Sequence, residues 1–282
     1  MRYVNMILIL AVCVSITGTV RVAAELPESK DMPVTDSLGE GTEAPAESVP
    51  AVQADATQDP NSPAADAMRA SNPLDESKQS AVWIDTSTQP TTPIVVGMST
   101  DGGINWINQS LALPVNVTSV ELHSVRIDLL GRTHILLTGT GASERDAGIY
   151  IYSTDKDCKT FRRPIRLFAN NSNGVASEPV CAVNVIPQHY LRNHIYVAWV
   201  VRGRQYSEVL FTKSLNGGYT FWTVPMRLDV ANQNNVSNPG IAIGPFGEIT
   251  VSWDIDPGST GHQSRFGRTS YDGVNFYGLQ AQ

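Results

Sequence analysis

From Ala81 onward the sequence alternates apolar and polar residues in short runs, which are separated by turn residues rich in Gly, Ser, Asp and Asn. Alternation with a period of two is typical of strands that bury one face. We therefore expect an all-β structure. The runs predict strands at residues 81–85, 94–98, 124–130, 133–138, 148–152, 164–168, 179–186, 194–201, 209–213, 224–228, 239–243, 248–254 and 265–269.

Four short segments resemble one another, each with a Ser, an Asp or Asn two residues later, and a closing aromatic residue. The Ser and Asp side chains can accept hydrogen bonds from the amides of a tight turn, and Gly tolerates the positive φ found there. The closing aromatics follow one another after 55, 60 and 55 residues. The residues concerned are Ser99, Asp101 and Trp106; Ser153, Asp155 and Phe161; Ser214, Asn216 and Phe221; Ser270, Asp272 and Phe276.

Each of these turns lies between two predicted strands, and two further strands precede the turn in the second, third and fourth repeats. Four antiparallel strands in about 55 residues make up one blade of a β-propeller. The repeats therefore predict a β-propeller of about four blades, which is small, open or incomplete. Either its two ends combine to close the ring, or the blades form an open arc. A β-sandwich with similar turns is the alternative, against which the regular spacing argues.

The four segments resemble the Asp-box, or BNR, repeat S-x-D-x-G-x-[ST]-[FW] of the sialidase-like β-propellers, and the resemblance covers roughly residues 81–282. The first segment fits except for Asn105, and the third carries Asn216 in place of Asp. The second is one residue too long and has no Gly, and the fourth is one residue too short. The resemblance implies that the boxes are structural and lie at the periphery of the blades, away from the ligand face.

The loops at the opposite end of the blades from the boxes are predicted to form the ligand face, because functional residues concentrate on loops held by a rigid scaffold. The last of these loops, residues 255–263, also contains Asp256 and His262. The candidate ligand-binding residues of these loops are Arg145, Asp146, Glu178, Arg202, Arg204, Tyr206 and Asp254.

The resemblance also implies the groups that a sialidase needs, namely an arginine cluster, a Tyr nucleophile and acidic residues. The sequence departs from that pattern, since no Arg-Ile-Pro motif precedes the first box. We assign no catalytic residue, no metal and no cofactor. The leading hypothesis is a non-catalytic module that binds a glycan or a protein. The alternatives are an exo-sialidase or related glycoside hydrolase, and a surface assembly factor or degenerate fragment; the oligomeric state stays open.

Composition divides the 282 residues into three parts. Residues 1–24 hold Arg2, an apolar run and small residues at the end, which predict a cleaved secretory signal; an uncleaved anchor is the alternative. Residues 25–80 hold 12 acidic, 3 basic and no aromatic residues, which predict a disordered linker. Residues 81–282 hold 15 acidic and 15 basic residues, without the positive surplus of a nucleic-acid-binding domain.

The predicted signal indicates a secreted, periplasmic or cell-surface protein with no membrane span after cleavage. Such a compartment permits disulfides. Cys158 and Cys181 are the two cysteines beyond the signal segment, and the sequence leaves open whether they pair or remain thiols.

Overall fold

The computed structural model describes residues 62–87, 94–155, 158–172, 174–204, 206–229, 235–255 and 264–281. All of them belong to one compact unit that spans Asp59–Gln282. The predicted signal segment, and the predicted linker as far as residue 61, lie outside the described residues.

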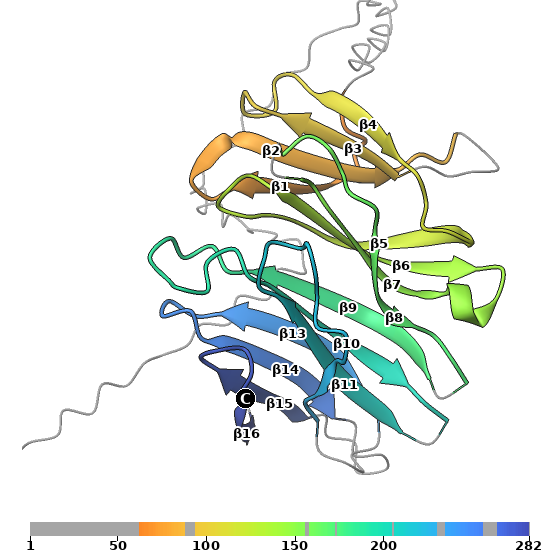
Figure 1. Ribbon diagram of the computed structural model, residues 1–282, viewed down its shortest axis with the longest axis vertical. Coiled ribbons are helices and arrows are strands. Elements are labelled where there is room, and N and C mark those ends of the chain that lie inside the picture. The colour runs from red at the N-terminus through yellow and green to blue at the C-terminus, as the bar shows by residue number, and fades with distance from the viewer. Residues whose placement is uncertain are drawn as a thin grey trace, which may run out of the picture. The chain divides into compact units, whose positions relative to one another are not determined.

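Within the described residues, sixteen strands form four antiparallel sheets of four strands, and each sheet takes its strands in chain order (Figure 1). The prediction of an all-β propeller with about four four-stranded blades is confirmed. A single turn of 3₁₀-helix, η1 (Glu144–Asp146), interrupts the second sheet.

The first sheet consists of β1 (Met68–Asn72), β2 (Asp75–Ile84), β3 (Ile94–Ser99) and β4 (Ile107–Leu111). The second consists of β5 (Val117–Ile127), β6 (Thr133–Gly141), β7 (Gly148–Ser153) and β8 (Ile165–Ala169). The third consists of β9 (Val175–Val183), β10 (Ile195–Arg202), β11 (Ser207–Ser214) and β12 (Met226–Arg227), and the fourth of β13 (Val236–Ile243), β14 (Ile249–Ile255), β15 (Ser264–Ser270) and β16 (Tyr277–Ala281).

The first sheet begins earlier in the sequence than predicted. Strand β1 and the first half of β2 lie within residues 68–80, which we expected to belong to the disordered linker, so the structured region starts before residue 81. The side chains of β1 alternate between exposed and partly buried, and Met68 and Ala70 pack against a hydrophobic core. A strand with so few apolar residues has the composition of a linker, which is why composition placed the boundary too late.

Three buried hydrophobic clusters hold successive sheets together. One joins the first two sheets around Ile94 and Ile135, the second joins the second and third sheets around Trp199, and the third joins the third and fourth sheets around Trp253. The first strands of successive sheets also contact one another, β1 with β5, β5 with β9 and β9 with β13. Among the described residues no such cluster joins the fourth sheet to the first.

The turns between the third and fourth strands of the sheets all lie at one end of the blades, which we call the turn end. In the first of them, Oγ of Ser99 accepts the amide of Gly103 at 2.9 Å, and Oδ1 of Asp101 accepts the amide of Asn105 at 2.9 Å. Asn216 and Asp272 accept turn amides in the same way in the third and fourth sheets. These bonds satisfy amides that have no strand partner.

The turn of the second sheet, which is longer and has no Gly, uses its side chains differently. Oγ of Ser153 bonds Nδ1 of His134 at 2.9 Å, and Asp155 accepts the hydroxyl of Tyr219 from the neighbouring turn of the third sheet. The segment that departs from the repeat pattern is therefore also the one whose Asp contacts the neighbouring blade. The closing aromatics of the four turns all lie against the protein interior: Trp106 is 8% exposed, and Phe161, Phe221 and Phe276 pack against the three clusters.

Candidate functional site at the loop end

The end of the blades opposite the turn end, which we call the loop end, carries irregular backbone at equivalent places. The first strand of the second sheet loses register at Thr118 and again further along at His123, and the first strands of the third and fourth sheets lose register at Glu178 and Asn238. Glu178 and Asn238 have φ values of +54° and +51°, and each precedes a proline, Pro179 or Pro239. Positive φ is uncommon for a residue other than glycine, a following proline restricts the backbone further, and such strain concentrates at functional sites.

A continuous set of polar contacts crosses from the third sheet to the fourth at these two bulges. Arg202, at the end of β10, pairs with Glu178. Oε2 of Glu178 accepts the backbone N–H of Asn238 at 2.6 Å, and Nδ2 of Asn238 donates to Asp254 at 2.9 Å. Nη1 of Arg265 completes the set by donating to Asp254 at 2.9 Å. We call these five residues the Glu178–Asp254 network; it brings together three of the predicted ligand-face residues.

The network is open to solvent on one side. The side chains of Arg202 and Glu178 are 55% and 36% exposed, whereas that of Asp254 is 18% exposed. Arg265 is fixed by a further bond of 2.7 Å from Nη2 to Oγ of Ser252. Carboxylates and guanidinium groups held in place in this way can recognise the hydroxyls or charged groups of a sugar, and a carboxylate pair is what glycoside hydrolysis uses.

Two other predicted residues, Arg204 and Tyr206, lie apart from the network. They line a cleft of about 530 Å³ between the second and third sheets. Val201 lines the same cleft, and since neighbouring residues of a strand face opposite sides of the sheet, the cleft and the network lie on opposite faces of the third sheet. Arg227 lies beside this cleft, where its Nη1 donates to Glu208 at 2.6 Å and its guanidinium lies 5.7 Å from the ring centre of Tyr206.

The remaining two predicted residues, Arg145 and Asp146, belong to η1 in the second sheet. The backbone oxygen of Arg145 accepts Nη1 of Arg166 at 2.8 Å, and the carboxylate of Asp146 accepts Oγ of Ser143 at 2.6 Å and Nδ2 of Asn116 at 3.2 Å. The bond from Ser143 is the main reason that the pKa of Asp146 lies below its usual value. Asp146 lines a groove of about 820 Å³ between the first two sheets, away from the network. Two further loop residues, Asp256 and His262, lie outside the described residues.

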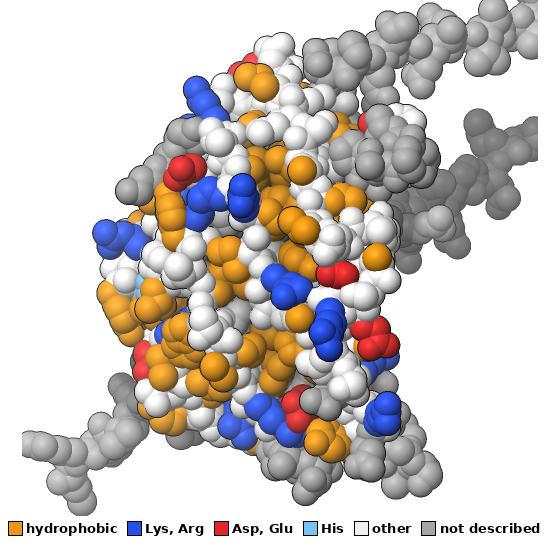
Figure 2. Space-filling view, turned by 45° about the vertical axis from the view of Figure 1, so that its right-hand side comes forward, with side chains coloured by type: hydrophobic (Ala, Val, Ile, Leu, Met, Phe, Trp, Pro, Cys, Tyr) orange, Lys and Arg blue, Asp and Glu red, His pale blue; other side chains and the backbone are white. Residues whose placement is uncertain are grey.

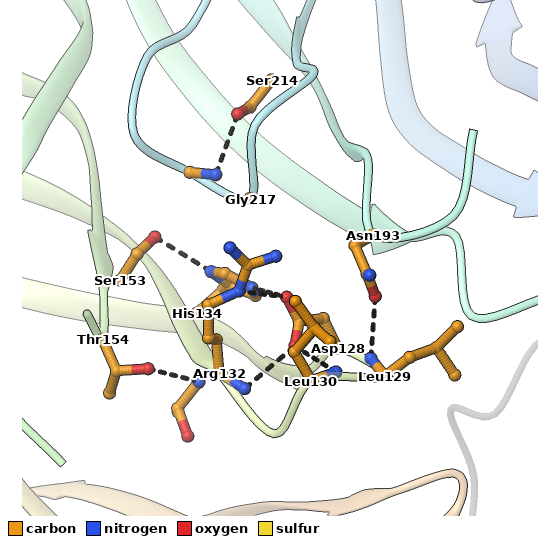
Figure 3. A network of polar contacts seen from close by, with 12 residues as sticks. Asp128, Leu129, Leu130, Arg132, His134, Ser153, Thr154, Asn193, Ser214 and Gly217 are labelled. Atoms are coloured by element: carbon orange, nitrogen blue, oxygen red, sulfur yellow. Dashed lines mark hydrogen bonds and ion pairs between the residues drawn. The ribbon is translucent and has the colours of Figure 1, made fainter. Parts of the chain in front are cut away.

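At the turn end, the second sheet buries charged side chains that sequence patterns did not single out (Figure 3). The carboxylate of Asp128 is fully buried and accepts Nε of Arg132 at 2.6 Å and the amides of Arg132 and Leu130 at 2.9 Å. Nε2 of His134 lies 3.5 Å from the same carboxylate. Burial alone raises the pKa of Asp128, but the contacts with His134 and Arg132 outweigh it and hold the pKa below its usual value.

Ser153, His134 and Asp128 therefore have the residue types of a Ser-His-Asp triad. Their exposed fractions are 3%, 1% and 0%, so Ser153 offers no surface to a substrate. Burial lowers the pKa of His134 and favours its neutral form. The amide of Leu129 also donates to Oδ1 of Asn193 at 3.0 Å, which ties the second sheet to the third (Figure 3). We interpret this group as structural, because it joins two blades and is closed to solvent.

Sequence reasoning missed Asn238 and Arg265 at the loop end. The pairs Glu178-Pro179 and Asn238-Pro239 follow a Ser in both first strands, and this repeated Ser-X-Pro was the available signal. Proline cannot donate to the sheet, so it marks an irregular place in a strand. Within the described residues no group of three His, Cys, Asp or Glu side chains is placed to hold a metal. No helix in the described part of the chain is long and apolar enough to cross a membrane.

The described structure is similar to that of an α-L-arabinanase from Penicillium chrysogenum in complex with arabinobiose, with a TM-score of 0.53 and 15% sequence identity over 78% of this chain and 69% of that chain. It is also similar to the GH93 α-L-arabinofuranosidase of Fusarium graminearum in complex with arabinobiose, with a TM-score of 0.52 and 13% identity over 77% of this chain and 65% of that chain. No protein-family model matches the sequence, and no curated protein does.

The chain thus spans about two thirds of the length of these two structures. At such low identity the similarity shows the fold alone. The class of protein is a β-propeller whose structural relatives include glycosidases, built here from four four-stranded antiparallel blades.

Proposed function

We propose that this protein is an exported, sialidase-like β-propeller module that binds a glycan at the loop end of its blades, with the Glu178–Asp254 network as the centre of the site. The observation that carries the proposal is the strained pair of bulges at Glu178 and Asn238, which hold two carboxylates and two arginines on one partly exposed surface. The glycosidase relatives favour a carbohydrate over a protein as the ligand, although a protein partner is the alternative.

Titration of the purified protein with arabinobiose and with sialyllactose, after a glycan array has shown which class it prefers, tests this proposal. Arg202→Ala removes a network guanidinium that is 55% exposed, so we expect at least tenfold weaker binding with little change in stability. Arg192→Ala is the matched control, because Arg192 is exposed and lies in the turn between β9 and β10, at the turn end. Equal affinities of Arg202→Ala and wild type would refute the site; an array without hits, together with a reproducible protein partner from the native host, would favour the adaptor function.

Glycoside hydrolysis is the second candidate function. One residue, Asn238, bonds both Glu178 and Asp254, and a pair of carboxylates held near one another is the arrangement that glycosidases use. We expect no release of fluorophore from an aryl α-L-arabinofuranoside or an aryl sialoside, because both carboxylates are already paired with arginines, Glu178 with Arg202 and Asp254 with Arg265. Release that is abolished by Glu178→Gln and by Asp254→Asn, and retained by Arg192→Ala, would establish the hydrolase instead.

A further inference from the structure

The groove between the first two sheets has a mainly apolar lining that includes two buried tyrosines. It is about 820 Å³ in volume and runs between strands β7 and β8 and the connection from β4 to β5. Tyr150 and Tyr152 form part of the lining and are 4% and 2% exposed. Their hydroxyls donate to the backbone oxygens of Asp146 and Ala112, each at 2.6 Å, so both hydroxyls already have a partner within the protein.

The rim of this groove is positively charged. Arg162, Arg163 and Arg166 all line it, whereas Asp146 is the only acidic residue of the lining. Arg163 and Arg166 are exposed, and in the described part of the chain neither forms an ion pair with a carboxylate. The carboxylate of Asp146 accepts hydrogen bonds from Ser143 and Asn116 instead. Two guanidinium groups therefore face solvent at one groove. Nη1 of Arg166 donates to the backbone oxygen of Arg145 at 2.8 Å, and the carboxylate of Asp146 is close enough to attract Arg166 electrostatically, but within the described residues neither arginine is tied up in an ion pair.

A guanidinium group binds carboxylates and sulfates through two parallel hydrogen bonds, so this rim suits an anionic ligand. The volume of the groove is that of a site for an extended small ligand or a few sugar units. Single-stranded nucleic acid would need exposed aromatic rings on which bases stack, and the tyrosines of this groove are buried. The zero net charge of residues 81–282 also argues against nucleic acid. Figure 2 shows one face of the molecule on which Lys and Arg side chains lie beside exposed hydrophobic ones.

We propose that the groove between the first and second sheets binds a segment of an acidic polysaccharide, whose carboxylate or sulfate groups pair with Arg163 and Arg166. The inference does not depend on the function proposed for the Glu178–Asp254 network, which lies in the third and fourth sheets. The two sites differ in ligand chemistry, since the network offers both charges and the groove offers mainly positive charge.

The test is calorimetric titration of the full-length mature protein with oligogalacturonate, which carries carboxylates, and with a heparin-derived oligosaccharide, which carries sulfates. We expect Arg163→Ala/Arg166→Ala to weaken binding of the preferred anion at least tenfold. Arg163→Lys/Arg166→Lys keeps the charge without the paired donors and should lose only part of the affinity. Arg192→Ala removes an exposed arginine outside the groove and should bind as wild type does. Because the arginines are exposed, circular dichroism should show that all three variants fold.

Three results would overturn the proposal. Wild type that binds neither oligosaccharide excludes it, and equal weakening by Arg192→Ala means that general charge attraction is responsible. Competition by polyglutamate or by a single-stranded oligonucleotide at equal charge concentration would assign the groove to another acidic polymer. A second titration separates this test from that of the network. Arg202→Ala should weaken the binding of neutral arabino-oligosaccharides, whereas the variants of Arg163 and Arg166 should leave that affinity unchanged.

Discussion

The backbone amide of Asn238 donates a hydrogen bond of 2.6 Å to the carboxylate of Glu178, so the bulge of one blade binds the bulge of the next. Both residues have positive φ, both precede a proline, and the side chain of Asn238 continues the contact to Asp254. The backbone conformation at these two positions is what places the carboxylates where they are. Strain in the first strands of the third and fourth blades therefore controls the arrangement of the candidate site.

Two substitutions of Asn238 separate strain from hydrogen bonding. Both Asn238→Gly and Asn238→Ala delete the bond to Asp254, but glycine adopts positive φ freely while alanine does not. We expect Asn238→Ala to be about 1 kcal/mol less stable than Asn238→Gly in urea unfolding, because a left-handed conformation costs alanine about that much. Equal stabilities would mean that the positive φ at this position is not a source of strain.

The turn of the first sheet should affect stability and not ligand binding. Asp101→Ala removes the acceptor for the amides of Ile104 and Asn105, so we expect the thermal midpoint to fall by a few degrees with an unchanged glycan affinity. Asp85→Ala is the control, because the carboxylate of Asp85 accepts from Ser87 outside these turns, and its effect should be smaller. An unchanged midpoint in Asp101→Ala would show that the turn is misinterpreted.

The same carboxylate predicts a dependence on acid. The amide and side chain of Asn105 hold the pKa of Asp101 down to about 2, compared with 3.8 for an unperturbed aspartate. Since the folded state has the lower pKa, the stabilisation from Asp101 is complete above about pH 4 and is lost as the pH falls toward 2. Urea unfolding of wild type and Asp101→Asn between pH 5 and 2 measures this contribution. Identical pH profiles for the two proteins would contradict it.

The overall arrangement was predictable because its signal is local. Each turn requires a Ser, an Asp or Asn and a closing aromatic within a few residues, and such short segments can be recognised in a single sequence. Strand β1 was not predictable in this way, because its polar composition resembles that of the linker before it. Its pairing with β2 and its contact with β5 give it a place that its own residues do not specify.

The candidate site was only partly predictable, because its contacts join residues far apart in the sequence. The structure brings Glu178, Arg202 and Asp254 together at the loop end, whereas Arg145 and Asp146 lie in η1 of the second sheet, where Asp146 lines a separate groove. Which residues meet depends on the packing of one sheet against the next, and no sequence period encodes this. The buried pair of Asp128 and Arg132 was not predicted for a similar reason. Both residues flank the turn between β5 and β6, and charged residues beside a turn are usually exposed.

The pairing and the reactivity of the two cysteines can also be tested. Cys158 and Cys181 do not form a disulfide in the structure, and burial raises the pKa of the Cys181 thiol to about 12. A thiol with so high a pKa is almost entirely protonated near neutral pH and reacts slowly. We expect one cysteine of the mature folded protein to react with a thiol reagent at pH 8, and both to react in denaturant. Rapid labelling of Cys181 under native conditions, located by peptide mapping, would contradict the burial.

The buried pair Asp128–Arg132 should be the most sensitive point of the described structure. Asp128→Ala leaves the guanidinium of Arg132, whose side chain is 8% exposed, without its partner. Removing one member of a buried ion pair costs about 3–5 kcal/mol, so we expect a loss of that size or no cooperative transition at all. Asp75→Ala breaks an exposed pair with Lys78 and should change stability little. A variant of Asp128 within about 1 kcal/mol of wild type would rule out a structural role for the group.

The histidine beside this pair gives the last prediction, which concerns mildly acidic pH. Burial is the main cause of the lowered pKa of His134, so between that pKa and the ordinary value of 6.5 the unfolded chain binds a proton that the folded protein does not. Stability should therefore fall as the pH drops below 6.5. Carboxylates titrate lower, so urea unfolding between pH 7 and 5 isolates the histidines. His134→Gln should reduce this slope without abolishing it, because burial also lowers the pKa of His123 and His194. If His134→Gln is too unstable to measure, the ring resonances of His134 in wild type serve instead, and a midpoint at or above 6.5 would contradict the prediction.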